Sequence, residues 1–280
     1  MKLTARSLIS FHNQIHTSLK VQKGLKALFL CLVTFIGIAY ASDVGISPPR
    51  LELTGRPGQT VTETVTLFTT APSQQQISVE MSDWTLSPEG GVVFLPIGSA
   101  QNSASPWLAL ETDDFLLEPE GARDVRLSVT LPDDPNLKGT YQGIVFFRVI
   151  PPDSAVTGVG VVTTTRVGLV VYITVTGTEQ AGSEFIDLYQ ENDESLTVVV
   201  ANTGNTLMRV GGVVELRGED GETKHRLEVP DVAVLRESER GITLPLEGIE
   251  GGFYVALALL EDSRGGLLVG ELPIEVPVRD

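Results

Sequence analysis

The sequence predicts an all-β protein made of two immunoglobulin-like β-sandwich domains that follow an N-terminal signal peptide. Three observations predict this fold. Apolar and polar residues alternate with a period of two from Ser47 to the C-terminus. Gly, Pro and Asp interrupt the alternation at short intervals, and no long segment keeps the i, i+3, i+4 spacing of a helix. The polar, Gly-containing segment 177–183 has no pattern and is typical of a hinge between domains.

Residues 1–41 have the features of a secretory signal peptide. Five basic residues and no acidic residue accompany the apolar run Ala27–Ala39, and Ala39-Tyr40-Ala41 supplies the small residues that signal peptidase requires. We expect cleavage before Ser42 and export to the periplasm, with the cell surface as the alternative. Because the apolar run is shorter than the roughly 20 residues that span a membrane, we expect no membrane anchor after cleavage.

The mature chain is acidic and contains no cysteine. Cys31 is the only cysteine and leaves with the leader, so disulfide and thiol chemistry are excluded. Removing five basic residues leaves 15 Lys and Arg against 36 Asp and Glu, and the net charge falls from −16 to −21. This charge argues against nucleic acid or an anionic membrane as the partner, because both attract clustered cations.

The first domain is predicted at 42–176 and the second at 184–280. Turns such as Ser87–Gly91 and Pro132–Pro135 separate the strands of the first domain. These strands are expected at Ile46–Leu53, Val61–Phe68, Ile77–Trp84, Val92–Leu95, Trp107–Leu110, Arg123–Leu131, Tyr141–Val149 and Val161–Val175.

The second domain is expected to have seven strands, which is the number in one immunoglobulin-like sandwich. Asn202-Thr203-Gly204-Asn205 is predicted as a tight turn, since Asn and Gly tolerate positive φ. The strands are expected at Phe185–Tyr189, Ser195–Ala201, Leu207–Arg217, Lys224–Val229, Arg240–Leu244, Gly252–Glu261 and Leu267–Val276.

The mature chain offers few groups for catalysis, and we predict no enzyme, no cofactor and no metal. Its one histidine, His225, is interpreted as an exposed strand residue. The G-x-S-x-G, G-x-x-x-x-G-K-[ST] and H-E-x-x-H motifs are absent. The acidic pairs Asp113-Asp114, Asp133-Asp134 and Asp193-Glu194 leave carboxylate catalysis or calcium binding formally open, although each lies at a turn where solvated acids are common.

Three ordered patterns in the first domain carry a resemblance to a known family. The segment Ile46–Leu53 contains an S-P-x-R core, Phe115–Gly121 is similar to an F-x-L-x-P-G turn, and Tyr141–Pro152 ends in I-P-P. In this order and spacing they resemble the N-terminal domain of the PapD-like periplasmic chaperones that assemble pili. The resemblance covers about 130 residues. The second half of the chain resembles the family only in being another β-sandwich that follows a hinge.

The resemblance implies that the chain lends an edge strand to an unfinished pilus subunit, a form of β-strand addition. Val161–Val175 takes the place of the family's donor strand, and Val159, Val161 and Thr163 would present one apolar face to the subunit. The alternative is that these three residues fill the core of their own domain.

The family also holds the carboxyl terminus of the subunit with one Arg and one Lys. Arg50 matches the Arg, whereas Gly168 stands where the family has its Lys. Arg166 lies two residues earlier and points to the same face of an extended strand, so we expect it to substitute for the Lys. A planar guanidinium suits this task because it donates two parallel hydrogen bonds to a carboxylate. For Arg50, the alternative is an ordinary surface arginine.

The sequence therefore favours a non-catalytic, periplasmic, chaperone-like protein. Its expected partners are a secreted or pilus subunit protein and an outer-membrane usher, and no nucleic acid. The alternative is a structural or adhesive cell-surface protein whose domains act as spacers or docking modules.

Overall fold

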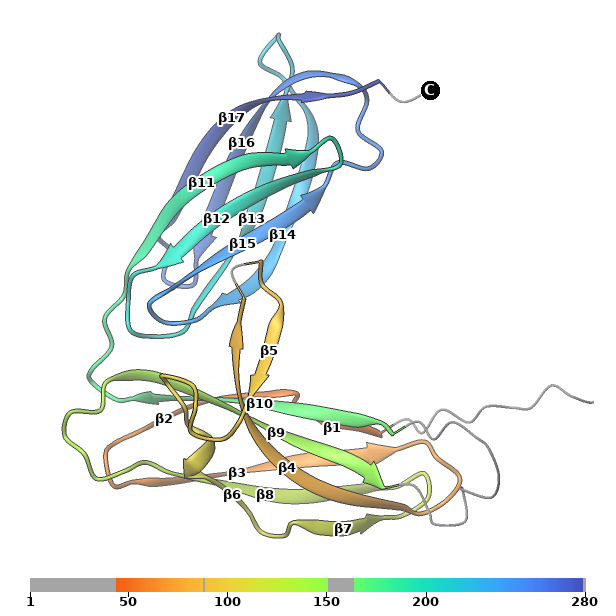
Figure 1. The fold of residues 1–280 in the computed structure, drawn as a ribbon, viewed down its shortest axis with the longest axis vertical. Coiled ribbons are helices and arrows are strands. Elements are labelled where there is room, and N and C mark those ends of the chain that lie inside the picture. Colours follow the sequence, from red (N-terminus) through yellow and green to blue (C-terminus); the bar gives the residue numbers. More distant parts are fainter. Residues whose placement is uncertain (1–43, 88, 151–163, 279–280) are drawn as a thin grey trace, which may run out of the picture. The chain divides into compact units, whose positions relative to one another are not determined.

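A computed structural model describes residues 44–87, 89–150 and 164–278 (Figure 1). These residues form two β-sandwiches, which confirms the predicted all-β, immunoglobulin-like fold. In the described part of the chain, the helical element is η1 (Ser105–Trp107), a single turn of 3₁₀ helix.

The first sandwich packs a four-stranded sheet against a six-stranded sheet. The four-stranded sheet has the order β1-β3-β8-β6 and consists of β1 (Val44–Ser47), β3 (Thr60–Thr69), β8 (Ala122–Thr130) and β6 (Leu108–Leu110). The six-stranded sheet has the order β2-β10-β9-β4-β5, with β7 also paired to β4. Its strands are β2 (Arg50–Gly55), β10 (Arg166–Val175), β9 (Gly139–Ile150), β4 (Gln75–Leu86), β5 (Val92–Leu95) and β7 (Asp114–Leu117).

Alternate side chains of both sheets meet in the core of the first sandwich. Fully buried members include Leu67, Ile77, Leu127, Phe147 and Leu169. Each fully buried side chain of this size contributes about 1.5–3 kcal/mol of transfer free energy. The period-two pattern of the sequence is thus the pattern of inward-facing residues.

The second sandwich has a three-stranded sheet, β11-β12-β15, and a four-stranded sheet, β14-β13-β16-β17. Its strands are β11 (Ser183–Asn192), β12 (Ser195–Asn202), β13 (Met208–Arg217), β14 (Thr223–Val234), β15 (Ser238–Pro245), β16 (Gly252–Asp262) and β17 (Leu267–Val276). Leu196, Val198, Leu216, Ala256 and Leu260 lie at the centre of its core. All seven predicted strands are present in this sandwich.

The single strand predicted at Ile46–Leu53 is wrong, because the chain forms two strands there. β1 pairs with β3 in one sheet, and β2 pairs with β10 in the other. Pro48 and Pro49 separate them, and neither proline has an N–H to continue a ladder. The chain crosses from one sheet to the other at this point.

Three further predictions need correction. Trp107 belongs to η1 and not to a strand, since Pro106 at the start of this turn favours helical φ. The segment at Phe115 forms strand β7 before its turn, because Phe115 and Leu117 bury their side chains in the core. His225 does lie on a strand, β14, but it is half-buried and its ring meets Tyr254 edge-on with centroids 5.8 Å apart.

The segment 202–205 connects β12 and β13, which belong to opposite sheets. The predicted use of positive φ is wrong, since none of these four residues has it. Instead, the buried Asn202 side chain fixes the connection. Its Nδ2 donates to the carbonyl oxygens of Thr206 (2.7 Å) and Val234 (3.1 Å), and its Oδ1 accepts from the Gly204 N–H at 3.0 Å.

Candidate partner-binding edge

The first four residues of β10 form an edge of the six-stranded sheet. β10 pairs with β9 along its whole length, from Arg166 opposite Arg148 to Val175 opposite Gly139. On its other side, β10 pairs in parallel with β2 only from Val170 onward. Arg166–Leu169 therefore has a backbone partner on one side and none on the other within the described residues.

The hydrogen-bond pattern identifies the backbone groups on this free side. The Val149 N–H donates to the Thr165 carbonyl oxygen at 2.9 Å, so Thr165 faces β9. In an antiparallel ladder, alternate residues face the same neighbour, and Val167 and Leu169 therefore also face β9. The N–H and C=O groups of Arg166 and Gly168 point to the open side. The Val170 N–H follows the same alternation and donates to the Pro49 carbonyl oxygen at 3.2 Å.

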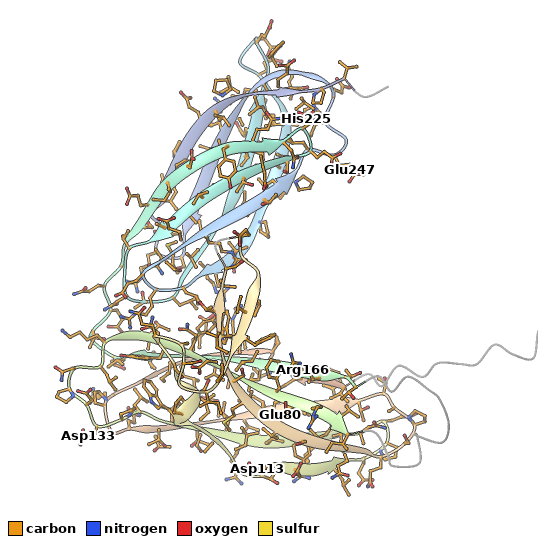
Figure 2. All side chains as sticks on the ribbon, in the orientation of Figure 1. Glu80, Asp113, Asp133, Arg166, His225 and Glu247 are labelled. Atoms are coloured by element: carbon orange, nitrogen blue, oxygen red, sulfur yellow. The ribbon has the colours of Figure 1, made fainter. Side chains whose placement is uncertain are left out.

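Arg166 projects from the outer face of the six-stranded sheet, which also carries Glu80 (Figure 2). Its Cζ lies 4.3 Å from the centroid of the Phe146 ring and 5.2 Å from that of Phe94. The two rings themselves pack edge-on at 5.0 Å. Among the described residues Arg166 has no ion pair, whereas the neighbouring Arg148 binds the Glu80 carboxylate at 2.9 Å. The stacked guanidinium keeps its N–H donors for another acceptor.

Arg50 begins β2 and lies beside Val170 in the parallel register. Val170 and Arg166 have the same parity on β10, so Arg50 and Arg166 share the outer face of the sheet. Four residue positions separate them along the strand, roughly 13 Å at 3.3 Å per residue. The Arg50 Nε binds Glu52 Oε1 at 2.8 Å, and both side chains are about half exposed. Glu52 Oε1 also accepts from the Arg209 guanidinium at 3.1 Å.

Gly168 occupies a position where two side chains already fill the space. A Cβ atom built on Gly168 would lie 3.0 Å from Ile144 Cδ1 and 3.2 Å from Phe146 Cε1. Either neighbour would have to move to admit a longer side chain. The absence of the family's Lys at position 168 thus goes together with the presence of Phe146, whose ring fills this space and also stacks against Arg166.

Aromatic residues on this outer face were not predicted as part of the site. Trp84 and Tyr172 meet edge-on at 5.9 Å, and they form one buried cluster with Ile144 and Phe146. Burial raises the pKa of the Tyr172 hydroxyl to about 12. One sequence signal could have identified this cluster, the unbroken apolar run Ile144–Phe147 in β9. A strand that is covered on both faces loses the alternation of apolar and polar residues.

The predicted partner-binding residues Val159, Val161 and Thr163 lie outside the described residues, as does the start of the strand predicted at Val161–Val175. Strand β10 is described only from Arg166. The apolar face assigned to these three residues stays a prediction.

The acidic pairs do not gather into one site. Figure 2 shows Asp113 and Asp133 in separate loops, before β7 and after β8. Within the described residues, no three His, Cys, Asp or Glu side chains are close enough to hold a metal ion. The same part of the chain contains no helix that is long and apolar enough to cross a membrane.

No protein-family model matches this chain, and no curated protein matches its sequence. Among solved structures, it is similar to the YadV chaperone, with 10% identity, 83% of this chain and 100% of that chain covered, and a TM-score of 0.48. It is also similar to the E. coli chaperone DraB, with 13% identity, coverage of 85% and 97%, and a TM-score of 0.43.

A third match is the CsuC–CsuE chaperone–tip adhesion subunit pre-assembly complex from the archaic chaperone-usher Csu pili of Acinetobacter baumannii. It has 10% identity, coverage of 85% of this chain and 100% of that chain, and a TM-score of 0.44. All three matched structures contain chaperones.

Proposed function

We propose that this chain is a non-catalytic, exported, chaperone-like protein that binds an extended segment of a secreted partner by adding it to the sheet beside β10. The open side of Arg166–Leu169 is the observation that carries this proposal. A partner strand placed there would pair with the N–H and C=O groups of Arg166 and Gly168. Each backbone hydrogen bond made in this way contributes about 0.5–1.5 kcal/mol.

The open edge lacks the usual features that protect a sheet edge from pairing. Charged side chains, especially Lys, and prolines commonly block such edges. Here Val167, Gly168 and Leu169 follow Arg166 without a proline or a further charge. Arg166 itself leans over Phe146 and Phe94 on the face of the sheet, so its side chain does not cover the edge.

The same outer face supplies two cations for a carboxylate of the partner. Arg166 is free of ion pairs within the described ranges, and Arg50 is held only by an exposed pair with Glu52. Exposed pairs of this kind contribute about 0–1 kcal/mol, so a partner carboxylate can replace Glu52 at low cost. We propose that Arg50 and Arg166 bind the C-terminal carboxylate of the partner, a secreted or pilus subunit in the periplasm.

A proline substitution tests the edge directly. Arg166 is the first residue of β10, a position where proline is tolerated, and its N–H points away from β9. Arg166→Pro should therefore leave the β9–β10 ladder intact and remove one donor from the open edge. The tagged mature protein would be used to capture partners from a periplasmic extract, with identification by mass spectrometry.

We expect the wild type to capture a defined partner, and Arg166→Pro to capture about tenfold less of it than Arg166→Ala does, the loss of about 1.4 kcal/mol. Arg166→Ala is the matched control for the edge, because it removes the side chain and keeps the N–H. Equal capture by Arg166→Pro and Arg166→Ala, with unchanged circular dichroism, would reject strand addition at this edge. If the protein captures no partner and fractionates with the cell envelope, the result would favour a structural role at the cell surface.

The anchor has its own test. A peptide with the C-terminal sequence of the captured partner would be compared in free-acid and amidated forms. We expect Arg50→Ala together with Arg166→Ala to abolish the preference for the free acid, whereas Arg148→Ala keeps it, because Arg148 is already paired with Glu80. Unchanged preference in the double variant would rule out these two arginines as the anchor.

A further inference from the structure

The second sandwich carries an exposed apolar surface on strands β16 and β17, which are neighbours in the four-stranded sheet (Figure 1). We call it the β16–β17 apolar face. Large apolar side chains at the surface of a soluble protein commonly mark an interaction site when they are contiguous. The exposed fractions are 64% for Phe253, 40% for Val255, 36% for Leu259, 76% for Leu267 and 54% for Val269.

The strand register makes these side chains contiguous. Leu259 lies directly opposite Val269, and Leu267 lies two positions before Val269 in β17, on the same side of the sheet. Their neighbours Ala258, Leu260 and Leu268 point the other way and are buried in the core. The exposed set is therefore a second apolar face of the sheet, separate from the side chains that fold the sandwich.

Acidic side chains border this face. Glu261 lies opposite Leu267, Glu271 opposite Leu257, and Glu275 opposite Phe253, so all three share the outer side of the sheet. All three are exposed, and none forms an ion pair within the described ranges of the chain.

Two cations on the same side of the sheet share one carboxylate. Arg217 and Arg226 both bind the Glu215 carboxylate, at 2.7 Å and 2.8 Å. This group keeps one excess positive charge, against the three unpaired carboxylates of Glu261, Glu271 and Glu275, so the net charge beside the apolar face is negative.

We propose that the β16–β17 apolar face binds an extended segment of a partner protein in which Lys or Arg follows apolar residues at alternate positions. Outward side chains of β17 are about 7 Å apart, which is also the spacing of alternate side chains in an extended segment. Such a segment can place apolar groups on Leu267 and Val269 and cations beside Glu271 and Glu275. This site is independent of the β10 edge and lies in the other sandwich.

The charge selects this occupant over a second copy of the chain. A second copy would bring the same unpaired carboxylates and a strongly acidic chain to the contact, and like charges repel in a closely packed interface. An anionic membrane is disfavoured for the same reason.

The proposal is tested with a fluorescently labelled peptide, Leu-Thr-Val-Thr-Lys-Thr-Thr-Thr-Lys-Thr, whose lysines are four positions apart like Glu271 and Glu275. The control peptide has Glu in place of both Lys residues. Fluorescence anisotropy with the mature chain would measure both affinities. We expect the Lys peptide to bind at least tenfold more tightly than the Glu peptide and to weaken as salt is raised.

Two sets of variants locate the binding. Leu267→Ser with Val269→Ser, and separately Glu271→Gln with Glu275→Gln, should each weaken binding about tenfold. Val92→Ser with Val93→Ser, which changes two comparably exposed residues of the first sandwich, should have no effect. Arg166→Pro should also bind normally, which separates this site from the β10 edge.

Three results would overturn the proposal. The first is equal affinity for the Lys and Glu peptides, or no binding of either. The second is binding that the Leu267 and Val269 substitutions leave unchanged while circular dichroism shows a folded protein. The third is concentration-dependent self-association in analytical ultracentrifugation that these substitutions abolish, since a second copy would then be the occupant.

Discussion

Two adjacent glycines of β13 are expected to respond to alanine in opposite directions. Gly212 has φ of +148°, in a region that is essentially restricted to glycine. A Cβ atom at this position would overlap the carbonyl oxygen of Leu259 and lie 2.9 Å from the Cα of Leu260, both in the paired strand β16. Backbone strain costs about 1–3 kcal/mol. Displacing β16 loses further hydrogen bonds at about 1 kcal/mol each. We therefore expect Gly212→Ala to destabilise the second sandwich by about 3 kcal/mol.

Gly211 provides the matched control. A Cβ atom there would meet its nearest neighbours at 3.4 Å, an ordinary van der Waals contact, and its φ is not positive. Gly211→Ala should raise stability by about 0.4–1 kcal/mol, because alanine restricts the unfolded chain more than glycine does. The two substitutions add the same methyl group one residue apart.

Scanning calorimetry of the mature chain measures the difference, and hydrogen–deuterium exchange of β13 identifies the transition of the second sandwich. At about 4–8 °C for each kcal/mol in a domain of this size, Gly212→Ala should lower the midpoint by about 12–24 °C. Gly211→Ala should raise the midpoint by a few degrees. Similar midpoints for the two variants would refute the strain and overlap that are assigned to Gly212.

Three other predictions concern titration and buried polar groups. Because the pKa of Tyr172 is raised to about 12, only the unfolded chain ionises this hydroxyl between pH 10 and 12. Stability should fall there by about 1.4 kcal/mol per pH unit, and Tyr172→Phe should remove this component in urea titrations. Hydrogen bonds from Arg217 and Thr223 lower the pKa of Glu215. Glu215→Gln should thus be less stable than wild type at pH 7, with the difference lost as the pH falls below about 4. Asp83 accepts from the Ala100 N–H at 2.8 Å and from the Ser103 hydroxyl at 2.6 Å. Asp83→Ala should cost about 1–3 kcal/mol and speed proteolysis between β5 and η1.

Local patterns were sufficient to predict most strands. The seven strands of the second sandwich follow from alternation and turn residues, because inward and outward positions alternate within any half-buried strand. Where the prediction was wrong, contacts between residues distant in sequence determined the structure. Ile46–Leu53 reads as one alternating strand, but the prolines divide it between two sheets whose other strands come from far along the chain.

The candidate site shows the same limit. Arg50 and Arg166 were predicted from local motifs, and the parity of β10 was enough to place Arg166 on the same face as position 168. The stacking of Arg166 on Phe94 and Phe146 could not be predicted, since the three residues come from β10, β5 and β9. No local pattern records which strands lie side by side.

The sequence by itself determined that this is an all-β protein of two sandwiches and which residues of each strand face inward. Both results depend on local patterns, namely the two-residue alternation of apolar and polar side chains and the turn and hinge residues that interrupt it. Only the tertiary structure decided that β2 begins to pair with β10 at Val170, which leaves Arg166–Leu169 without a second strand partner among the residues that the structure describes. It also decided that Phe146 and Ile144 crowd Gly168. Both results depend on the register between strands that are distant in sequence, and register is set by packing across the whole sandwich.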